Sequence, residues 1–352
     1  MKICIVLPKF ARKAIGGYKI AFEYANRLSK RGYQVEILFM NKVAFEGRKM
    51  PSVAKSIASN IMTEIEPRWF DLDKNIKKIS GLKHGFEEKI RDVDVAIATA
   101  QDTVEAVKNF FPNAKKVYLI QDYEVWCESE ENVWATYKEG FTNIVISEWL
   151  KEIVDKIADV PSVLIKDPVD TEAYRCKIEL KKRKKHSIAF LYHSAEYKGT
   201  VYAIKAIKKL KEKYQDLEVR AFGTTSKPSD IPSYVQYTHC ATQAQTIEIY
   251  NNSSVFLCAT VAEGYGLTGL EAMACGTALV STDYQGVHEY ATDGVNALLS
   301  PVKDVCALVA NVSKLFDDDE LRYQIAKSGI KSVQKDFNWD VAVDKFEKAI
   351  MT

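Results

Sequence analysis

The stretch that decides the fold is EGYGLTGLEAMACG, which runs from Glu263 to Gly276. An apolar run, 254–258, precedes it, and the order of strand, glycine-rich turn and helix start is typical of a doubly wound α/β domain. A helix start offers unpaired backbone N–H groups and the positive end of the helix dipole, which together suit a phosphate. Glu263 on the turn and Glu271 in the first helical turn would accept hydrogen bonds from hydroxyls near that phosphate. The stretch therefore predicts a site for a phosphorylated, hydroxyl-rich ligand.

A purely structural interpretation of the same stretch stays open. Thr268 and Glu271 have the spacing of a capping box, with Thr268 as the N-cap residue and Glu271 three positions later. Gly276 has the place of a glycine that ends a helix at C′. Glu263 favours the ligand interpretation, because a carboxylate in a glycine turn behind an apolar strand has no structural need.

The stretch resembles the E-x7-E motif of the retaining glycosyltransferases of family 4, a large group with the GT-B fold. The similarity extends through EAMACGTALV, residues 271–280. The resemblance implies an α/β fold of two Rossmann-like, doubly wound domains that face a cleft, with a C-terminal helix that crosses back to the first domain. It also implies that Glu263 orients the donor sugar and that Glu271 accepts from the ribose hydroxyl. The positions that would hold the donor diphosphate through the backbone are Gly266, Leu267 and Thr268.

The length of 352 residues suits two domains. We expect a first domain over 1–166, joined by a crossover helix in 337–352, and a nucleotide-sugar-binding domain over 187–336. A polar and basic segment, 166–186, is the expected hinge. Apolar runs predict the strands 2–7, 34–40, 93–98, 116–120 and 143–146, and then 187–192, 217–222, 233–238, 254–258, 278–281 and 296–299.

Two strand ends carry candidate phosphate ligands. Gly17 follows the first strand and begins a helix at 18–30, where glycine lets a backbone approach a ligand, although a tight turn explains it equally. The pattern G-x-G-x-x-G is absent, so a nicotinamide cofactor is not expected.

In the family an Arg and a Lys hold the leaving diphosphate after the first strand of the second domain. Lys198 matches the Lys, whereas His193 stands at the Arg position and donates fewer hydrogen bonds.

The string LIQDYE, residues 119–124, ends another strand. Many family members have His where this chain has Gln121, and that His contacts the donor sugar around its 6-hydroxyl. The string resembles a sub-branch with bacterial rhamnosyltransferases, so we hypothesise a 6-deoxy donor such as dTDP-rhamnose. Asp122 is a candidate polar contact or base, and turn stabilisation is the equal alternative. Tyr123 and Trp126 are the candidate acceptor-side aromatic residues.

Composition excludes several classes of protein. The formal net charge of +2 gives no field that points to nucleic acid. The basic run 181–185 fits a solvated linker, with a patch for anionic lipid or polyanion as the alternative.

Cysteines without C-x-x-C spacing indicate a reduced, cytoplasmic compartment, and the apolar run 3–7 is too short for a signal or spanning segment. The D-x-D strings at 71–73 and 92–94 fit polar turns, so neither a metal nor another cofactor is expected.

The resemblance implies a metal-independent, retaining transfer of sugar from a nucleotide-diphosphate sugar. The acceptor would be a glycan or lipid-linked glycan in cell-surface polysaccharide synthesis, with peripheral contact at the inner membrane face. Two alternatives stay open. One is a GT-B sugar phosphorylase, in which free phosphate replaces the nucleotide. The other is a non-catalytic partner subunit in glycan assembly, which the departures at His193 and Gln121 allow.

Overall fold

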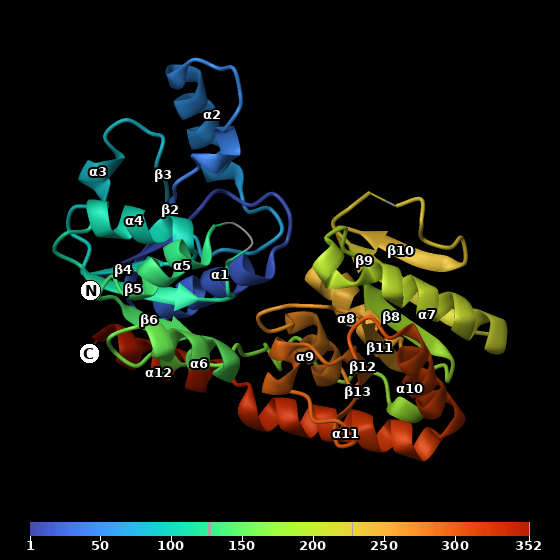
Figure 1. The fold of residues 1–352 in the computed structure, drawn as a ribbon. Coiled ribbons are helices and arrows are strands. Elements are labelled where there is room, and N and C mark those ends of the chain that lie inside the picture. Colours follow the sequence, from blue (N-terminus) through green and yellow to red (C-terminus); the bar gives the residue numbers. More distant parts are fainter. Residues whose placement is uncertain (126–127, 227, 352) are drawn as a thin grey trace. The chain divides into compact units, whose positions relative to one another are not determined.

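The structure is a computed structural model that describes residues 1–125, 128–226 and 228–351. The chain forms two compact units, shown in Figure 1. Unit 1 comprises Met1–Lys166 with Asp340–Thr352, and unit 2 comprises Asp167–Trp339. Within the described residues, no helix combines the length and the apolar character that crossing a bilayer requires. Trp126, a predicted acceptor-side residue, lies outside the described residues.

Within the described residues, unit 1 contains one seven-stranded parallel sheet. Its strands are β1 (Lys2–Leu7), β2 (Gln34–Phe39), β3 (Lys77–Ser80), β4 (Val95–Ala98), β5 (Lys115–Ile120), β6 (Thr142–Val145) and β7 (Val163–Leu164). The spatial order is β3-β2-β1-β4-β5-β6-β7. Residues 3–7 of β1 are all buried, because a parallel strand is covered on both faces. This is why the strand reads as a continuous apolar run.

The helices of unit 1 cover this sheet, and the last helix of the chain returns to it. They are α1 (Gly16–Lys30), the 3₁₀ turn η1 (Val43–Phe45), α2 (Ser52–Ile65), α3 (Phe86–Lys89), α4 (Gln101–Phe110), α5 (Glu130–Tyr137), α6 (Glu148–Ile157) and α12 (Trp339–Met351). The Phe346 ring of α12 stacks on Tyr24 of α1 with 4.2 Å between ring centroids. Lys115 Nζ donates to the Ala349 carbonyl at 2.8 Å. The predicted return of the C-terminal helix to the first domain is therefore confirmed.

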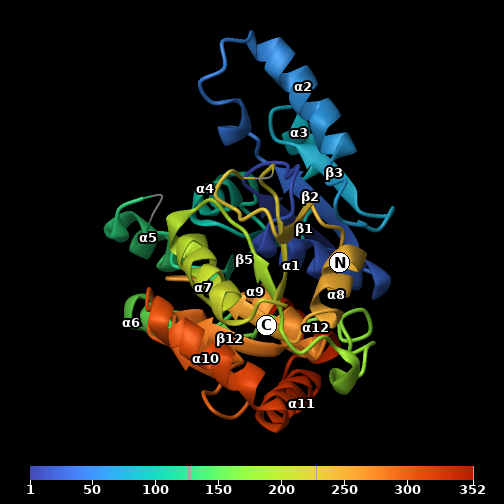
Figure 2. The same cartoon turned by 90° about the vertical axis from the view of Figure 1, so that its right-hand side faces the viewer.

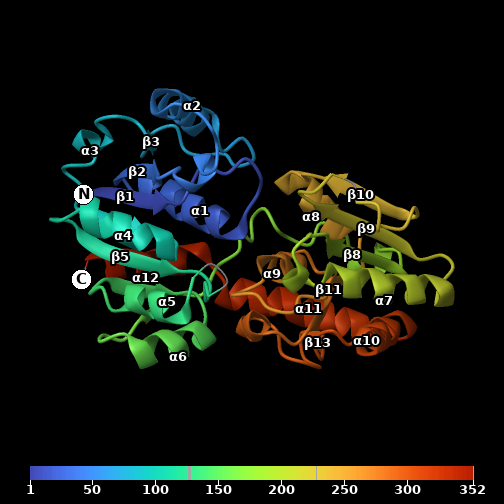
Figure 3. The same ribbon diagram turned by 45° about the horizontal axis from the view of Figure 1, so that its top comes forward.

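Within the described residues, unit 2 contains one six-stranded parallel sheet, drawn from another side in Figure 3. Its strands are β8 (Ser187–Leu191), β9 (Glu218–Gly223), β10 (Val235–His239), β11 (Val255–Cys258), β12 (Ala278–Thr282) and β13 (Ala297–Ser300). The spatial order is β10-β9-β8-β11-β12-β13. Both sheets are thus doubly wound and parallel, as predicted.

Helices of unit 2 alternate with these strands. They are η2 (Leu180–Lys182), η3 (Glu196–Lys198), α7 (Thr200–Lys213), α8 (Gln243–Asn251), α9 (Leu267–Ala274), η4 (Gln285–Glu289), α10 (Val305–Asp317) and α11 (Asp319–Asp336). Helices α7 and α10 pack side by side (Figure 3). Between helices and sheet lies a buried apolar core that includes Ile188, Ile207, Leu257 and Leu308.

Two local expectations need correction. The lysines 181, 182 and 184 of the basic run are exposed as expected, but Arg183 is only 7% exposed, so the run is not a free linker. The Arg183 guanidinium donates to the carbonyls of Cys275 at 2.6 Å and Gly276 at 3.0 Å, which fixes this segment in unit 2. Strand β3 was not predicted, because Lys77 and Lys78 occupy half of a short strand that pairs with β2 at the sheet edge.

Candidate functional site

The predicted diphosphate ligands of unit 2 lie together beside β8, at the point where the order of the strands in the sheet reverses. The chain runs from β8 outward through β9 to β10 and then returns to the other side of β8 as β11. In doubly wound sheets, the carboxyl ends of the two strands at such a switch point form the ligand-binding crevice. The loop 193–199 follows β8, and the loop 259–266 follows β11.

Backbone contacts hold these two loops against each other. The Tyr197 carbonyl accepts from the N–H of Val261 at 2.7 Å and of Ala262 at 3.3 Å. Gly199 has φ +63°, and a Cβ there would overlap the Ala259 carbonyl. Only glycine combines this backbone conformation with such a close approach. The Lys-Gly pair therefore places Lys198 beside the β11 loop.

Lys198 and Glu263 form an ion pair at this point. The two side chains are 16% and 23% exposed, so both remain accessible to a ligand. Burial lowers the pKa of Lys198, but the adjoining Glu263 carboxylate outweighs it, so the net shift of the pKa is upward. The amine therefore stays charged at neutral pH. Sequence analysis predicted a separate role for each residue, and the structure brings them into direct contact.

His193 is held as a neutral donor next to this pair. Its backbone is fixed by Thr200, whose hydroxyl donates to the His193 carbonyl at 2.7 Å. Burial and the Lys198 charge lower the pKa of His193, partly opposed by Glu263. The Ala195 N–H lies 3.1 Å from Nδ1, which therefore accepts, so the proton of the neutral ring is assigned to Nε2. Nε2–H can donate one hydrogen bond to an anion.

Helix α9 begins at Leu267, and Gly266 is its N-cap, with φ +98° and no side-chain cap. The capping-box interpretation is therefore wrong, since Thr268 already lies inside the helix. A Cβ at Gly266 would overlap the Tyr284 hydroxyl and lie 2.8 Å from the Tyr290 hydroxyl oxygen. The Tyr290 hydroxyl donates to the Gly266 carbonyl at 3.0 Å and lies 2.8 Å from that of Tyr284. This tyrosine pair positions the start of the helix, and sequence reasoning missed it.

The other end of α9 explains its glycine. Gly276 has φ +75°, and its N–H donates to the Met273 carbonyl at 2.9 Å. The Thr277 N–H donates to the Ala272 carbonyl at 2.9 Å, which completes a Schellman motif. The predicted C′ role of Gly276 is confirmed. Glu271, on the same helix, is 7% exposed and accepts from the Tyr250 hydroxyl at 3.2 Å.

Unit 1 has its own switch point, between β1 and β4. Gly17 lies in the first turn of α1, after the loop 8–15 that follows β1. A Cβ at Gly17 would lie 3.1 Å from Gln121 Oε1, so the Gln121 amide packs against this glycine. Within the described part of the chain, Gln121 Oε1 is buried without a hydrogen-bond partner. A ligand hydroxyl or amide could satisfy it.

Beside Gln121, the residues 122–124 carry two carboxylates. Asp122 Oδ1 accepts from the Tyr123 N–H at 2.9 Å, which suits a turn role. Glu124 Oε2 accepts from the Gln101 N–H at the start of α4 at 2.6 Å. Burial raises the pKa of Glu124 to about 7, and Asp102 and Asp122 add to the rise. The sequence contained a signal for Glu124, because it closes the charged string behind β5, but it was not selected.

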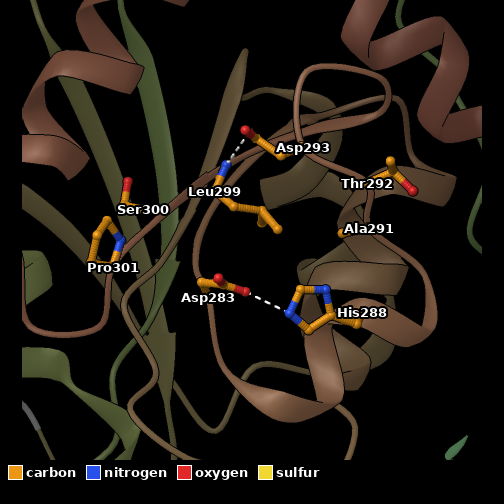
Figure 4. A pocket seen from close by; sticks show the side chains of 8 residues that line it. All are labelled: Asp283, His288, Ala291, Thr292, Asp293, Leu299, Ser300 and Pro301. Atoms are coloured by element: carbon orange, nitrogen blue, oxygen red, sulfur yellow. Dashed lines mark hydrogen bonds and ion pairs between the residues drawn. The ribbon is translucent and has the colours of Figure 1, made fainter.

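A separate pocket of about 360 Å³ lies behind β12 and β13 (Figure 4). Asp283 and His288 pair across it at 2.6 Å, and Asp293 accepts from the Leu299 N–H at 2.8 Å. None of its lining residues belongs to the set predicted from the sequence. One aspartate of each D-x-D string is held by the backbone, because Asp73 accepts from the Asn75 N–H and Asp94 from the Lys2 N–H.

Comparisons with known proteins find a family model that matches part of the chain and solved structures with the same fold. Residues 174–332 match the family model described as "Glycosyl transferases group 1". The capsular polysaccharide biosynthesis glycosyltransferase CapM of Staphylococcus aureus is 28% identical over 106 residues, which is 30% of this chain and 28% of CapM. The N,N'-diacetylbacillosaminyl-diphospho-undecaprenol alpha-1,3-N-acetylgalactosaminyltransferase of Campylobacter jejuni is 30% identical over 97 residues, which is 27% of this chain and 26% of that enzyme. The alignments thus span under half of these relatives' length.

The fold similarity extends over the whole chain. The structure of Anabaena HepE in complex with UDP-glucose matches with a TM-score of 0.76 at 13% identity, covering 100% of this chain and 99% of HepE. At this identity the match speaks for the fold alone. The two Rossmann-like units with parallel sheets are those of the GT-B glycosyltransferases, which confirms the predicted fold class. The family model thus matches unit 2 over residues 174–332, and the solved neighbour matches the fold of the chain.

Proposed function

We propose that this protein is a retaining, metal-independent glycosyltransferase of family 4 that uses a nucleotide-diphosphate sugar. The observation that carries the proposal is the cluster of Lys198, Glu263 and His193 at the switch point of unit 2. The N-terminus of α9 follows the same loop. A cation, a neutral donor and a helix N-terminus suit a diphosphate, and the carboxylate suits sugar hydroxyls.

The chemistry follows the charges that develop in the reaction. Breaking the anomeric C–O bond builds positive charge on the sugar and negative charge on the departing diphosphate. Lys198, with its raised pKa, and His193 Nε2–H stabilise the diphosphate, together with backbone N–H groups at Leu267 and Thr268. Such preorganised donors contribute several kcal/mol to the transition state, on the order of 3 kcal/mol each.

The bonds exchange on one face of the sugar. The acceptor oxygen forms the new bond to the anomeric carbon as the diphosphate leaves, and the acceptor proton passes to a leaving phosphate oxygen. No side chain needs to donate a proton to this leaving group. Glu263 holds sugar hydroxyls, and its ion pair with Lys198 links sugar orientation to diphosphate binding. Glu271, already hydrogen-bonded to Tyr250, accepts from the ribose or deoxyribose hydroxyl.

Unit 1 supplies polar contacts for the sugar substrates in this proposal. Gln121 offers a buried carbonyl oxygen beside Gly17, and Asp122 is the further polar contact or base. Because Gln121 replaces a His that contacts a 6-hydroxyl in the resembling family, a 6-deoxy donor such as dTDP-rhamnose is our donor hypothesis. The structural neighbour HepE was solved with UDP-glucose, so UDP-sugars are the rival donors.

The acceptor we propose is a glycan or a lipid-linked glycan in cell-surface polysaccharide synthesis. Two relatives support this choice, because CapM is described as a capsular polysaccharide enzyme and the Campylobacter enzyme acts on a diphospho-undecaprenol glycan. A lipid-linked acceptor requires the enzyme to work at a membrane surface. Peripheral contact at the inner membrane face is therefore part of the proposal.

A thermal-shift panel tests donor binding first. The panel compares UDP, GDP, ADP and dTDP and their sugars, and a ligand that binds only the folded protein raises its melting temperature. At 100 times its Kd, such a ligand stabilises by about 2.7 kcal/mol. We expect dTDP-rhamnose to give the largest shift. A clear preference for a sugar with a 6-hydroxyl would reject the 6-deoxy hypothesis and leave the transferase proposal intact.

Product analysis then tests the reaction. With donor and acceptor present, nucleotide diphosphate release and an unchanged anomeric configuration in the NMR spectrum are expected. Sugar transfer that needs inorganic phosphate and releases no nucleotide would identify a phosphorylase instead. If every nucleotide and nucleotide-sugar failed to bind, the proposal would be rejected in favour of a non-catalytic partner subunit.

A further inference from the structure

One helix of unit 1 presents an apolar stripe to the solvent. Helix α2 carries Val53, Ile57, Ile61 and Ile65 at intervals of four residues, so they share one helix face. Their exposed fractions are 69%, 57%, 53% and 40%. In Figures 1 and 2, α2 protrudes from the rest of unit 1.

Packing within unit 1 does not explain this stripe. The face of α2 toward the sheet is polar and buried, because Asn41 Nδ2 donates to Ser59 Oγ at 2.8 Å and to Thr63 Oγ1 at 3.0 Å. Ser59 Oγ also lies 2.7 Å from Ser80 Oγ. An ordinary surface helix places its apolar face inward and its polar face outward. Helix α2 has the reverse arrangement, so its isoleucines have no partner in the core of unit 1.

Basic side chains border the stripe. Lys42, Arg48 and Lys49 are exposed in the segment that leads into α2, and the exposed Arg68 follows the helix. The exposed acidic residues of the same segment are Glu46 and Glu64. Arg12, from the loop after β1, brings its guanidinium to 3.4 Å from Met62 Sδ. The exposed residues here are therefore apolar along α2 and mostly basic in the chain segment that leads into it.

We propose that this surface, called here the α2 stripe (Val53, Ile57, Ile61 and Ile65 with the preceding Arg48 and Lys49), docks on an anionic lipid membrane. An amphipathic helix with an exposed apolar face lies in the membrane interface with that face at the acyl boundary. Anionic headgroups attract the basic border. A second copy of the chain fits less well, because two such surfaces would bring like charges together.

The inference locates the peripheral contact in the proposed function, and it rests on that proposal only for its biological setting. Vesicle binding is measured without donor or acceptor, so its failure and the failure of sugar transfer are distinguishable. The test is co-sedimentation of the full chain with phosphatidylcholine vesicles, with and without phosphatidylglycerol. We expect binding to the anionic vesicles and weak binding to the neutral ones.

Two pairs of substitutions test the two parts of the surface. Ile57→Ser with Ile61→Ser removes the apolar part, and Arg48→Glu with Lys49→Glu reverses the charge. Each basic residue contributes about fivefold to partitioning on an anionic surface, so the charge pair should lower it at least tenfold. We expect a loss of about tenfold or more for the isoleucine pair, because each side chain returns to water.

Matched controls place the same changes elsewhere. Val160→Ser with Val295→Ser alters residues that are 68% and 55% exposed. Lys181→Glu with Lys182→Glu alters the other basic run of the chain. Both control proteins should bind anionic vesicles like the wild type. A melting curve of each variant checks the fold, and the charge pair still decides the question if the isoleucine pair unfolds.

Several results would overturn the proposal. These are no binding to anionic vesicles, equal binding to neutral vesicles, or equal losses in the control proteins. Light scattering that shows a dimer in the wild type and a monomer in the isoleucine variant would identify a second copy as the occupant. Loss of binding in the Lys181 and Lys182 variant alone would move the membrane contact to that run.

Discussion

Replacing Gly266 by alanine tests whether the position of the α9 start controls donor binding and transfer, as distinct from the stability of unit 2. Gly266 has φ +98°, and a Cβ there would overlap the Tyr284 hydroxyl and lie 2.8 Å from the Tyr290 hydroxyl oxygen. Both rings are buried, at 2% and 4% exposure, so they cannot turn away. The loop must therefore move by about 1.5 Å to reach an ordinary van der Waals separation.

The magnitude has two parts. A left-handed backbone costs an L-residue roughly 1–2 kcal/mol, and the overpacked contact adds roughly 1–3 kcal/mol. The matched control is Gly294→Ala, because Gly294 has φ +71° and a Cβ there would meet nothing within 4 Å. The control variant therefore carries only the backbone strain. A misplacement of about 1 Å in a substrate-positioning group lowers turnover roughly 100-fold.

The assay measures nucleotide diphosphate affinity by calorimetry and sugar transfer by nucleotide release, with urea unfolding as the check on stability. We expect Gly266→Ala to lower transfer about 100-fold and to weaken nucleotide binding, while Gly294→Ala stays within about twofold in both. If a folded Gly266→Ala protein bound and turned over the donor like the control, the α9 start would not position the diphosphate.

Three other changes test separate parts of the account. Lys198→Ala and Glu263→Gln should each lower transfer, measured by nucleotide release, by roughly 100-fold or more in a folded protein. The control is Lys205→Ala, which changes an exposed lysine. Wild-type turnover in both site variants would remove the site assignment. Tyr290→Phe removes the hydrogen bond to the Gly266 carbonyl, so donor KM should rise several-fold with a smaller change in kcat, and an unchanged KM would contradict the positioning role. Glu124→Gln should change the pH dependence of unfolding. Because burial raises the pKa of Glu124 from 4.5 to about 7, the folded state binds more protons than the unfolded state, and stability falls as pH rises through this window. The variant should gain about 3 kcal/mol over the wild type between pH 4.5 and pH 7 in urea titrations, and parallel curves would refute this.

The sequence predicted the sheets better than the site. Strands such as β11 are buried on both faces, so their apolar runs mark them without knowledge of their neighbours. The meeting of Lys198 and Glu263 depends on β8 lying beside β11, a pairing that joins segments far apart in the chain. Motif resemblance selected both residues, but only the strand order brings them into one ion pair.

The remaining differences have physical causes in distant contacts. The start of α9 is set by Gly266 and by the tyrosines 284 and 290, so the local capping pattern at Thr268 could not predict it. Helix α2 was not predicted within 41–90, and its isoleucines face outward, so their spacing alone does not tell which face meets the sheet. The pKa of Glu124 depends on its burial and on its hydrogen bond with the Gln101 N–H at the start of α4. The string LIQDYE reveals neither the burial nor this hydrogen bond.

A crystal structure of the protein with an intact nucleotide-diphosphate sugar tests the central claim most directly. The account predicts that the diphosphate lies at the carboxyl ends of β8 and β11, within hydrogen-bond distance of Lys198 Nζ and of the backbone N–H groups at Leu267 and Thr268. It also predicts that Glu263 contacts hydroxyls of the sugar. A diphosphate bound instead in the pocket of Asp283 and His288, or density away from the α9 start, would contradict the account.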